Sequence, residues 1–548
     1  MRLTGVSVRA ARSLVHTEAG GRVATHLLME DHGIRDLLNL DADARSPMGV
    51  HPGPLPQRHL CAWTSADRPL PDHDDPRPSA AQLHTAYRDG DTTPLEVLEK
   101  LFSGVDRRQF GHAHFSPFRT LDRDRAYRAA QASTDRYASG EPLGPLDGIP
   151  IPVKDHYAMI GLSAYCGGPS PMPSSSDDAH MVAALRQSGA LLVGTTHTTE
   201  WGMDPCGYNE FFSMPRNPHR PEYAAGGSST GAGVAVALGL SPLATGSDGG
   251  GSIRIPSALN GIVGIKPTFG RIGRSGDFFG ASSVSTAGPL GLTVEDLVQF
   301  LTATTASPDL NDPIQQWGPS PSEQAGSWRK ALHRGVDGAR IAVPQRLWEQ
   351  ADPEVASQGR ALLAQLQDQG AELVDVDLPI LAHAPAVGVL SIGMETLANL
   401  SDLVASAPET LSDSLHINLE VLRRIDVQDF LKAQCTRRAI QETMRDLLDD
   451  VHLMALPTTA SAAPPYPLSL DATAVLDDTA LRQMTHFTFL ANITGLPAGS
   501  VPSGTIDGLP IGLQFIGGAY DEASVFAAMA EARRLQGPLP CPRLTNPV

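Results

Sequence analysis

Regular hydrophobic spacing begins at Ser79 and predicts helices. Leu83 and Tyr87 are four residues apart, which places them on one face of a helix. Residues 93–96 then combine a capping box with a proline at the first helical position, ahead of a further apolar stripe. These signals predict two consecutive helices at the start of the main body of the chain.

Helical and strand patterns alternate further along the chain. Residues 178–188 have helical spacing, and residues 190–193 form an apolar run typical of a buried strand. The same order recurs later, where a helical pattern opens at Asp352 and a strand pattern covers 373–376. Alternation of this kind predicts α/β units.

The first 78 residues have a different pattern. Alternating apolar positions at the start of the chain, and again after Gly20-Gly21, predict a β-hairpin followed by a short helix near 34–40. Seven prolines interrupt residues 51–78, which removes backbone donors and helical torsion angles over most of that stretch. We therefore interpret 1–50 as an N-terminal extension, 51–78 as a proline-rich linker and 79–548 as one large domain.

The overall composition is that of a globular protein. Of 548 residues, 41% are hydrophobic and 19% are charged. The 42 basic and 60 acidic residues leave a formal net charge of −18, which repels phosphate backbones and anionic lipid surfaces. The chain also lacks an uninterrupted apolar run of about 18 residues, which a membrane span requires. These features argue against nucleic acid and membranes as partners.

The cysteines and histidines do not form a metal-binding pattern. Five scattered cysteines without a Cys-x-x-Cys pair fit neither a disulfide framework nor a zinc ribbon. His197 and Glu200 begin an inverted zinc-protease motif, but Trp201 stands where its second histidine is required. We therefore predict no metal, no cofactor, and a reducing compartment such as the cytoplasm.

Glycine is densest in two loops near the middle of the chain. Residues 226–233 have the sequence GGSSTGAG and residues 246–252 the sequence GSDGGGS, with a short apolar segment between them. Glycine allows backbone amides to approach a ligand closely and to converge on a developing negative charge. Because serine hydroxyls also lie in both loops, a functional site is favoured over a pair of tight turns.

Three familiar glycine-rich motifs do not fit these loops. A Walker phosphate loop fails because no lysine follows Gly231, and no Gly-x-Gly-x-x-Gly follows a predicted strand. Residues 227–231 satisfy the nucleophile-elbow pattern with Ser229 at its centre. The preceding residues 218–225, however, contain two prolines and polar residues instead of the required hydrophobic strand. A Ser-His-Asp hydrolase is therefore disfavoured.

A lysine at the end of an apolar, strand-like run completes a fourth pattern. Residues 148–155 have the sequence GIPIPVKD and place Lys154 at that end. Together with the two serine loops this segment resembles the amidase signature family, whose motifs occur in the same order and with the same spacing of Ser228 and Ser252. The likeness extends from residue 79 to roughly 535 and leaves 1–78 outside it.

The sequence departs from the family pattern at a few positions. Thr230, Ala232 and Gly233 alter the usual glycine-rich ending of the first loop. His156 and His197 stand where the family often has asparagine. We expect these departures to affect the shape of the substrate site more than its catalytic groups.

The resemblance implies an α/β fold, with a mixed central β-sheet flanked by helices on both faces, and a catalytic triad. Ser252 would be the nucleophile, Ser228 a bridging serine that follows a cis peptide bond, and Lys154 the base. A lysine accepts a proton only when it is neutral, and its reference pKa is about 10.4. Lys154 should therefore be buried, because burial lowers that pKa.

The resemblance also implies groups that stabilise the reaction. Asp248 and Arg254 are expected to organise the second loop as a charged, hydrogen-bonded pair, and Ser229 is expected to be a supporting hydroxyl. The implied oxyanion hole consists of backbone amides from Gly249, Gly250, Gly251 and Ser252.

The implied activity is hydrolysis of a linear amide bond in a small molecule through a seryl acyl-enzyme, with esters as further substrates. The apolar character of 394–450 and of the loop 203–212 favours a hydrophobic or aryl amide. The family also contains subunits of complexes that transamidate charged tRNA, which the negative charge and the extra residues 1–78 disfavour. Those extra residues could cover the core, form a homodimer contact or shape the entrance.

Overall fold

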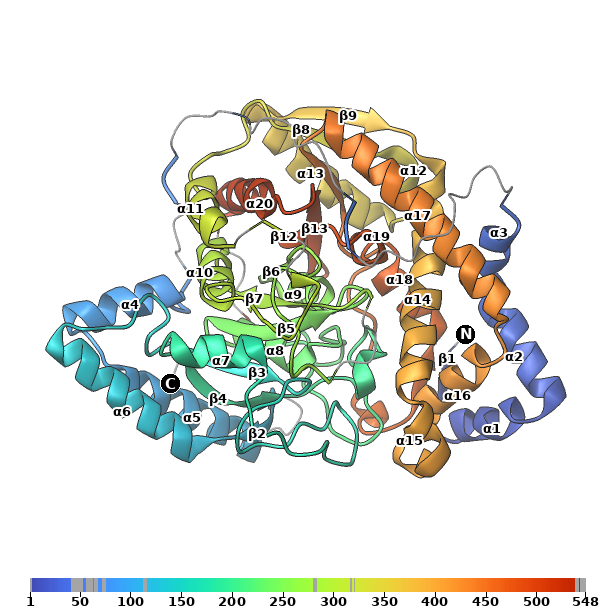
Figure 1. Ribbon diagram of the computed structural model, residues 1–548, viewed down its shortest axis with the longest axis horizontal. Helices are drawn as coiled ribbons and strands as arrows, with labels where there is room; N and C mark the ends of the chain where they lie inside the picture. The colour runs from blue at the N-terminus through green and yellow to red at the C-terminus, as the bar shows by residue number, and fades with distance from the viewer. Residues whose placement is uncertain are drawn as a thin grey trace.

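A mixed eight-stranded β-sheet runs through the centre of the computed structural model, with helices on both faces (Figure 1). The order of its strands is β5-β7-β6-β12-β13-β10-β8-β9, and all neighbours are antiparallel except the parallel pairs β10–β8 and β8–β9. The predicted α/β class with a mixed sheet is confirmed. The structure describes residues 2–40, 53–55, 63, 68–70, 75–111, 116–278, 283–315, 318–319, 321–537 and 542. The strands are β5 (Leu243–Asp248), β6 (Val263–Lys266), β7 (Thr286–Gly291), β8 (Arg340–Pro344), β9 (Glu372–Val376), β10 (Leu453–Pro457), β12 (Ala498–Ile506) and β13 (Leu509–Gly517).

A smaller three-stranded sheet lies against the edge strand β5. Its order is β2 (Phe118–Leu121), β4 (Leu191–Thr196) and β3 (Pro150–Lys154), and β3 contacts β5. Every residue of β3 and β4 is buried, as the continuous apolar runs predict. The end of β3 therefore lies at the junction of the two sheets.

The helices predicted from capping and spacing are present. Ser79 and Gln82 form a capping box at α4 (Ala80–Asp89), and Pro94 starts α5 (Pro94–Gly111). The patterns after 178 and 352 correspond to α7 (His180–Gln187) and α13 (Pro353–Asp368). The other helices after residue 111 are α6 (Arg123–Ser139), α8 (Thr230–Ala237), α9 (Arg254–Asn260), α10 (Val294–Thr304), α11 (Pro321–Ala331), α12 (Gln345–Trp348), α14 (Ala384–Asn399), α15 (Ser401–Ser406), α16 (Asp413–Leu422), α17 (Val427–Asp450), α18 (Asp478–Thr485), α19 (Phe489–Thr494) and α20 (Glu522–Gln536), with 3-10 turns η3 (Glu200–Gly202), η5 (Pro379–His383), η6 (Pro408–Thr410) and η7 (Leu468–Leu470).

The β-hairpin predicted for the N-terminal extension is wrong. Apart from β1 (Arg2–Thr4), which pairs with β11 (Val475–Asp477), the segment folds into α1 (Val6–Val15), α2 (Glu18–Asp31) and α3 (Ile34–Leu38). Helix capping outweighed the apparent alternation, because the Thr17 side chain accepts a hydrogen bond from the Gly20 amide at the start of α2. The short helix expected near 34–40 is confirmed as α3.

The N-terminal helices pack against elements from the second half of the chain. Figure 1 shows α1 to α3 (blue) beside α14, α16 and α17 (orange), on the opposite side of the molecule from α4 to α6. The proline-rich linker is described only at 53–55, 63, 68–70 and 75–78, where it forms neither helix nor strand, as predicted. The rest of the linker lies outside the described residues.

One helical stretch has the length and apolar composition of a membrane span, which the sequence pattern alone did not indicate. It covers Pro379–Asn399, the 3-10 turn η5 followed by α14, with a mean hydropathy of 1.4. Of the 18 most apolar consecutive residues in this stretch, 56% are buried. Helix α14 contacts α16, α17 and α19. These contacts place it in the helical layer beside the sheet, where its apolar side chains contribute to the core.

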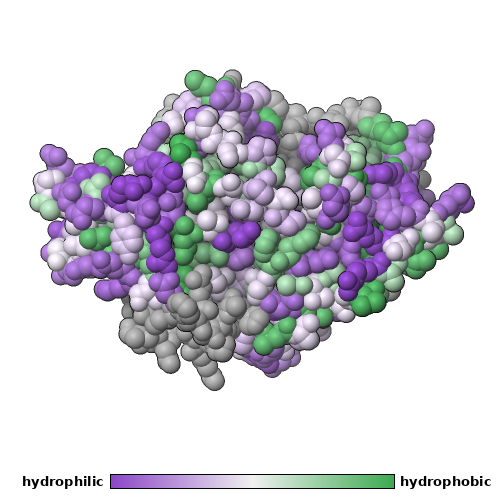
Figure 2. All heavy atoms as spheres, turned by 90° about the horizontal axis from the view of Figure 1, so that it is seen from below, coloured by the Kyte–Doolittle hydropathy of each residue, from purple (hydrophilic) through white to green (hydrophobic). Residues whose placement is uncertain are grey.

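The surface is mixed in character. The face seen from below is covered by hydrophilic residues with single hydrophobic residues between them (Figure 2). Among the described residues, several large exposed hydrophobic side chains are spread over the surface, as in Leu310 and Val427, which are 80% and 64% exposed, while α1 and α2 carry two each. Isolated side chains of this kind are normal on a protein surface.

Candidate active site

Lys154 lies fully inside the protein, at the end of β3. Its Nζ atom is 2.7 Å from the Ser228 Oγ and 2.8 Å from the Ser247 Oγ. Its backbone amide donates to the Thr245 Oγ1 at 2.8 Å, which fixes β3 against β5. Burial lowers the pKa of Lys154 to about 7, although nearby carboxylates act in the opposite direction. The prediction that Lys154 is buried is confirmed, and its amine contacts a serine of each glycine-rich loop.

The first serine loop leads into the buried helix α8. The peptide bond between Gly227 and Ser228 is cis, as the family resemblance implies. The Ser228 carbonyl accepts a hydrogen bond from the Thr198 Oγ1 at 2.8 Å, and its side chain is fully buried next to Lys154. The Ser229 amide donates to the Ser252 carbonyl at 3.3 Å. Backbone contacts therefore hold the two serine loops together.

The second serine loop follows β5 and turns sharply at its glycines. Gly251 has a φ of 121°, a conformation that favours glycine, and a Cβ atom there would lie 2.5 Å from the Thr488 Oγ1. At Gly250 a Cβ atom would lie 2.7 Å from the Phe489 ring. Protein side chains occupy the space of a Cβ atom at both positions, so glycine allows the loop to pack closely against Thr488 and Phe489.

One of the expected oxyanion donors is engaged elsewhere. The Gly251 amide donates to the Asp248 Oδ1 at 2.8 Å. A carboxylate three residues earlier in the chain thus takes this N–H in a local turn. The Gly251 N–H is therefore already used within the loop, and Gly249, Gly250 and Ser252 stay predicted as oxyanion donors.

Asp248 and Arg254 form the buried pair expected from the sequence. The Arg254 Nη2 and Nε atoms lie 2.9 and 3.0 Å from the two carboxylate oxygens, and both side chains are fully buried. Burial alone would raise the pKa of Asp248, but the charge and hydrogen bonds of Arg254 and a further hydrogen bond from Asn492 hold it below its usual range. Removing either partner would leave a buried charge without its counter-ion, which is strongly destabilising. Both partners must therefore stay together, and this fixes the second serine loop against the start of α9.

Ser252 lines a cavity of about 310 Å³. Part of the expected lining is confirmed, because the loop from Met203 to Glu210 and helix α16 contribute to it. Neither His156 nor His197 is among the described residues that line the cavity. The lining residues are Ala24, Leu27, Leu28, Asp31, His32, Glu200, Gly202, Met203, Asp204, Pro205, Tyr208, Asn209, Glu210, Gly250, Ser252, Val389, Ile392, Gly393, Ser412, Ser414, Leu415, Ile417, Asn418, Val421, Leu422, Thr473, Val475, Leu476, Asp477, Asp478, Leu481, Thr485 and Phe489.

Sequence reasoning missed Ser247 and Asn492 as members of the site. Ser247 contacts Lys154, and Thr245, two residues earlier on β5, contacts the amide of the same lysine. Side chains two apart on a strand share a face, so the pairing of Thr245 with Ser247 was a usable signal. The contact of Asn492 with Asp248 joins residues 244 positions apart, which no local pattern reveals.

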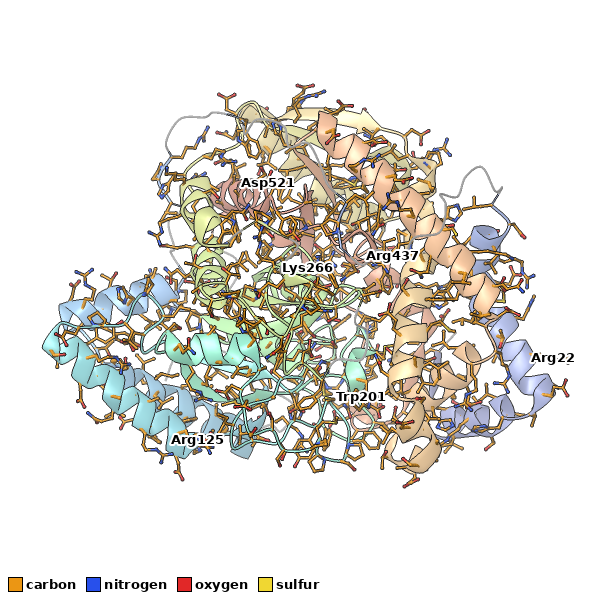
Figure 3. The ribbon with its side chains drawn as sticks, viewed as in Figure 1. Arg22, Arg125, Trp201, Lys266, Arg437 and Asp521 are labelled. Atoms are coloured by element: carbon orange, nitrogen blue, oxygen red, sulfur yellow. The ribbon has the colours of Figure 1, made fainter. Side chains whose placement is uncertain are left out.

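A second buried lysine lies near the charged pair. Lys266, at the centre of the molecule in Figure 3, is fully buried and its Nζ donates to the Pro267 carbonyl at 2.8 Å. Burial, reinforced by the charge of Arg254, lowers the pKa of Lys266 to about 7. Lys266 therefore resembles Lys154 in burial and pKa but has a different hydrogen-bond partner.

Possible metal ligands converge at a different place. Among the described residues, His16, His416 and Glu420 bring three possible ligand atoms within 4.8 Å of one another. Glu420 already pairs with Arg423 and Arg424, at 3.1 and 3.5 Å. All three residues lie outside the serine loops 226–233 and 246–252.

Comparison with known proteins agrees with this geometry. The family model described as Amidase matches residues 105–526. A glutamyl-tRNA(Gln) amidotransferase subunit from Halorhodospira halophila is 34% identical over 473 residues, covering 81% of this chain and 94% of the relative. Fatty acid amide hydrolase of Arabidopsis thaliana is 29% identical over 570 residues, covering 97% and 92%.

Solved structures give the same result. A bacterial aryl acylamidase belonging to the amidase signature enzymes superimposes with a TM-score of 0.74 at 26% sequence identity, covering 84% of this chain and 96% of the other. A structure described as an amidase gives a TM-score of 0.72 at 28% identity, covering 83% and 99%. Because the family model matches most of this chain, the chain belongs to the amidase signature family.

Proposed function

We propose that this protein hydrolyses a carboxylic amide through a seryl acyl-enzyme, with Ser252 as nucleophile, Ser228 as bridging serine and Lys154 as base. The observation that carries the proposal is the position of the Lys154 amine, which is fully buried and 2.7 Å from the Ser228 Oγ. Because burial lowers the pKa of Lys154 to about 7, a large fraction of the molecules carry a neutral Lys154 near pH 7, and this amine can accept a proton. Ser252, in the adjoining loop, faces the cavity where a substrate would bind.

In the first half-reaction, Ser252 attacks the amide carbonyl while its proton moves to Ser228 and the Ser228 proton moves to Lys154. The Ser252 oxygen forms a bond to carbon, and the carbonyl electrons move to oxygen. The backbone amides of Gly249, Gly250 and Ser252 are the donors that we propose for this oxyanion, and one such donor contributes about 10²–10³-fold in rate. When the intermediate collapses, the relay runs in reverse and protonates the departing amine.

In the second half-reaction, water takes the place of the amine. Lys154 accepts its proton through Ser228, water attacks the acyl-enzyme, and the Ser252 oxygen leaves with a proton returned by the same relay. Ser247 holds Lys154 on its other side at 2.8 Å, so the amine stays directed at the loops throughout. The product is a carboxylic acid, and the enzyme returns to its starting state.

The cavity favours an uncharged, apolar substrate over glutamine. The described residues that line it include Leu27, Ile392 and Phe489 but neither arginine nor lysine. A glutamine substrate carries an α-carboxylate, which requires a cationic partner in an apolar site. We therefore favour a hydrophobic amide over the transamidation function suggested by the relative from Halorhodospira halophila.

A panel of substrates tests this proposal. Purified protein should release acid and amine from hydrophobic primary amides and anilides, followed by mass spectrometry, and should release little ammonia from L-glutamine. The expected preference is at least tenfold in kcat/KM, because each buried methylene contributes about 0.8 kcal/mol to binding. Glutamine as the best substrate, or turnover only with added partner proteins, would instead favour the amidotransferase function.

A further inference from the structure

Helix α2 of the N-terminal extension lines the same cavity as Ser252. Ala24, Leu27 and Leu28 lie at helical spacing on one face of α2, and all three contribute to the cavity lining. The opposite face carries Arg22, which points away from the body of the protein in Figure 3. One face of α2 is thus a wall of the site and the other faces solvent.

Contacts with the body of the protein hold this wall in place. Val8 and Val15 of α1 are buried in one cluster with Ile417 and Val421 of α16. The Arg12 Nη1 atom lies 2.6 Å from the Asp413 Oδ1, at the start of α16, and joins α1 to the same helix. Because α16 also lines the cavity, the N-terminal helices and the cavity form one packed unit.

A second set of contacts anchors the end of α2. The His32 Nε2 atom lies 2.7 Å from the Asp478 Oδ1, and the Asp31 carbonyl accepts a hydrogen bond from the Arg482 Nη1 at 2.6 Å. Both partners lie on α18, which also contributes residues to the cavity. Helix α2 is therefore attached at its end to a helix that forms another wall.

Two acidic side chains of the lining, Asp204 and Glu200, are already engaged within the protein. Asp204 accepts hydrogen bonds from the backbone amides of residues 206–208. The Glu200 carboxyl accepts from the Ser412 amide, and burial raises the pKa of Glu200 to about 8. With these polar groups satisfied internally, the leucine, isoleucine and valine side chains remain as the principal contacts for a ligand.

We propose that α2 forms one wall of the pocket for the apolar chain of the substrate and limits the length of chain that the enzyme accepts. This inference rests on the proposed function and extends it to residues 1–40. Those residues precede the region matched by the family model, which begins at residue 105. The leucine side chains of this wall fit a substrate amide that carries an apolar chain.

Labelling with alkyl fluorophosphonates of different chain length tests the inference. In this reaction the Ser252 oxygen forms a bond to phosphorus, fluoride leaves with the bonding electrons, and the serine proton passes to the base. The alkyl group on phosphorus takes the place of the substrate chain. Rates are compared for a butyl and a dodecyl probe on the full chain, with the labelled residue identified by peptide mass.

Ala24→Trp places a large side chain in the pocket. We expect it to lower the ratio of dodecyl to butyl labelling at least tenfold, the effect of excluding about two methylene groups. Leu28→Ala removes most of a side chain from the pocket and should raise the ratio of dodecyl to butyl labelling. Arg22→Trp, on the opposite face of α2 and with a wild-type side chain that is 77% exposed, is the matched control and should leave both rates unchanged.

The outcomes separate this inference from the proposed function. If both probes label Ser252 but Ala24→Trp and Leu28→Ala leave the ratio unchanged, the role of α2 is wrong and the proposed chemistry stands. If neither probe labels Ser252 in any variant of intact melting temperature, the proposed function itself is wrong. Equal slowing of both probes by Ala24→Trp, without an opposite effect of Leu28→Ala, also contradicts the proposed pocket.

Discussion

Replacing Ser252 by alanine is expected to reduce kcat for amide hydrolysis by on the order of 10⁶-fold, as removal of a nucleophile does in other serine hydrolases. The variant lacks the oxygen that forms the acyl-enzyme, and the neighbouring Ser228 is directed at Lys154 instead of the cavity. Steady-state kinetics on a hydrophobic amide, with product measured by mass spectrometry, give the result.

A nearby serine provides the control for this experiment. Ser257 is buried on α9, five positions after Ser252, and its hydroxyl donates to the Ile253 carbonyl at 2.8 Å. Ser257→Ala should retain most of the activity, because this hydroxyl bonds within its own helix and has no part in the proposed relay. A folded Ser252→Ala protein that keeps more than about 1% of wild-type kcat would be inconsistent with a role as nucleophile.

Replacing Lys154 by methionine is expected to reduce kcat/KM by about 10⁴-fold, the upper range for loss of a general base. Methionine has a similar length and no charge, so it suits the fully buried position and removes the cost of keeping an amine away from water. We therefore expect the melting temperature to be unchanged or raised while activity is lost. Differential scanning fluorimetry and kinetics on the same sample separate these two effects.

The pH profile of kcat/KM tests whether Lys154 is the group that accepts the proton. Lys154 is active in its neutral form, which predominates above its pKa of about 7, so kcat/KM of the wild type should rise with pH through about 7 and then level off. Lys266 has the same lowered pKa and provides the matched control through Lys266→Met. The rise should disappear in Lys154→Met and persist in Lys266→Met, and the reverse pattern would assign the titration to Lys266.

The residues that we propose as catalytic could be recognised in the sequence because their signals are local. Ser228 and Ser252 lie in short glycine-rich loops, and Lys154 ends a continuous apolar run, so each could be recognised within about ten residues of sequence. Alternating helix and strand patterns predicted the α/β units, and the family resemblance implied the mixed sheet. Burial of Lys154 was expected because the proposed chemistry requires a neutral amine, and the junction of two sheets supplies that environment.

The remainder of the site depends on contacts between distant segments. The second hydroxyl on Lys154 comes from Ser247, 93 positions away, through the packing of β3 against β5. Engagement of the Gly251 amide by Asp248 depends on the torsion angles of the loop, which its composition does not specify. The helical N-terminus was missed because two stretches of alternating apolar positions were weighted above the Thr17 cap.

The central claim is that a neutral Lys154 activates Ser252 through Ser228 to form an acyl-enzyme. Mixing the protein with a slowly deacylating nitrophenyl ester, quenching in acid and mapping the peptides by mass spectrometry tests this claim most directly. We predict one acyl group per chain, located on Ser252, with the acylation rate rising through pH 7. An acyl group on Ser228 or Ser229, or rapid turnover without any acylated peptide, would contradict it.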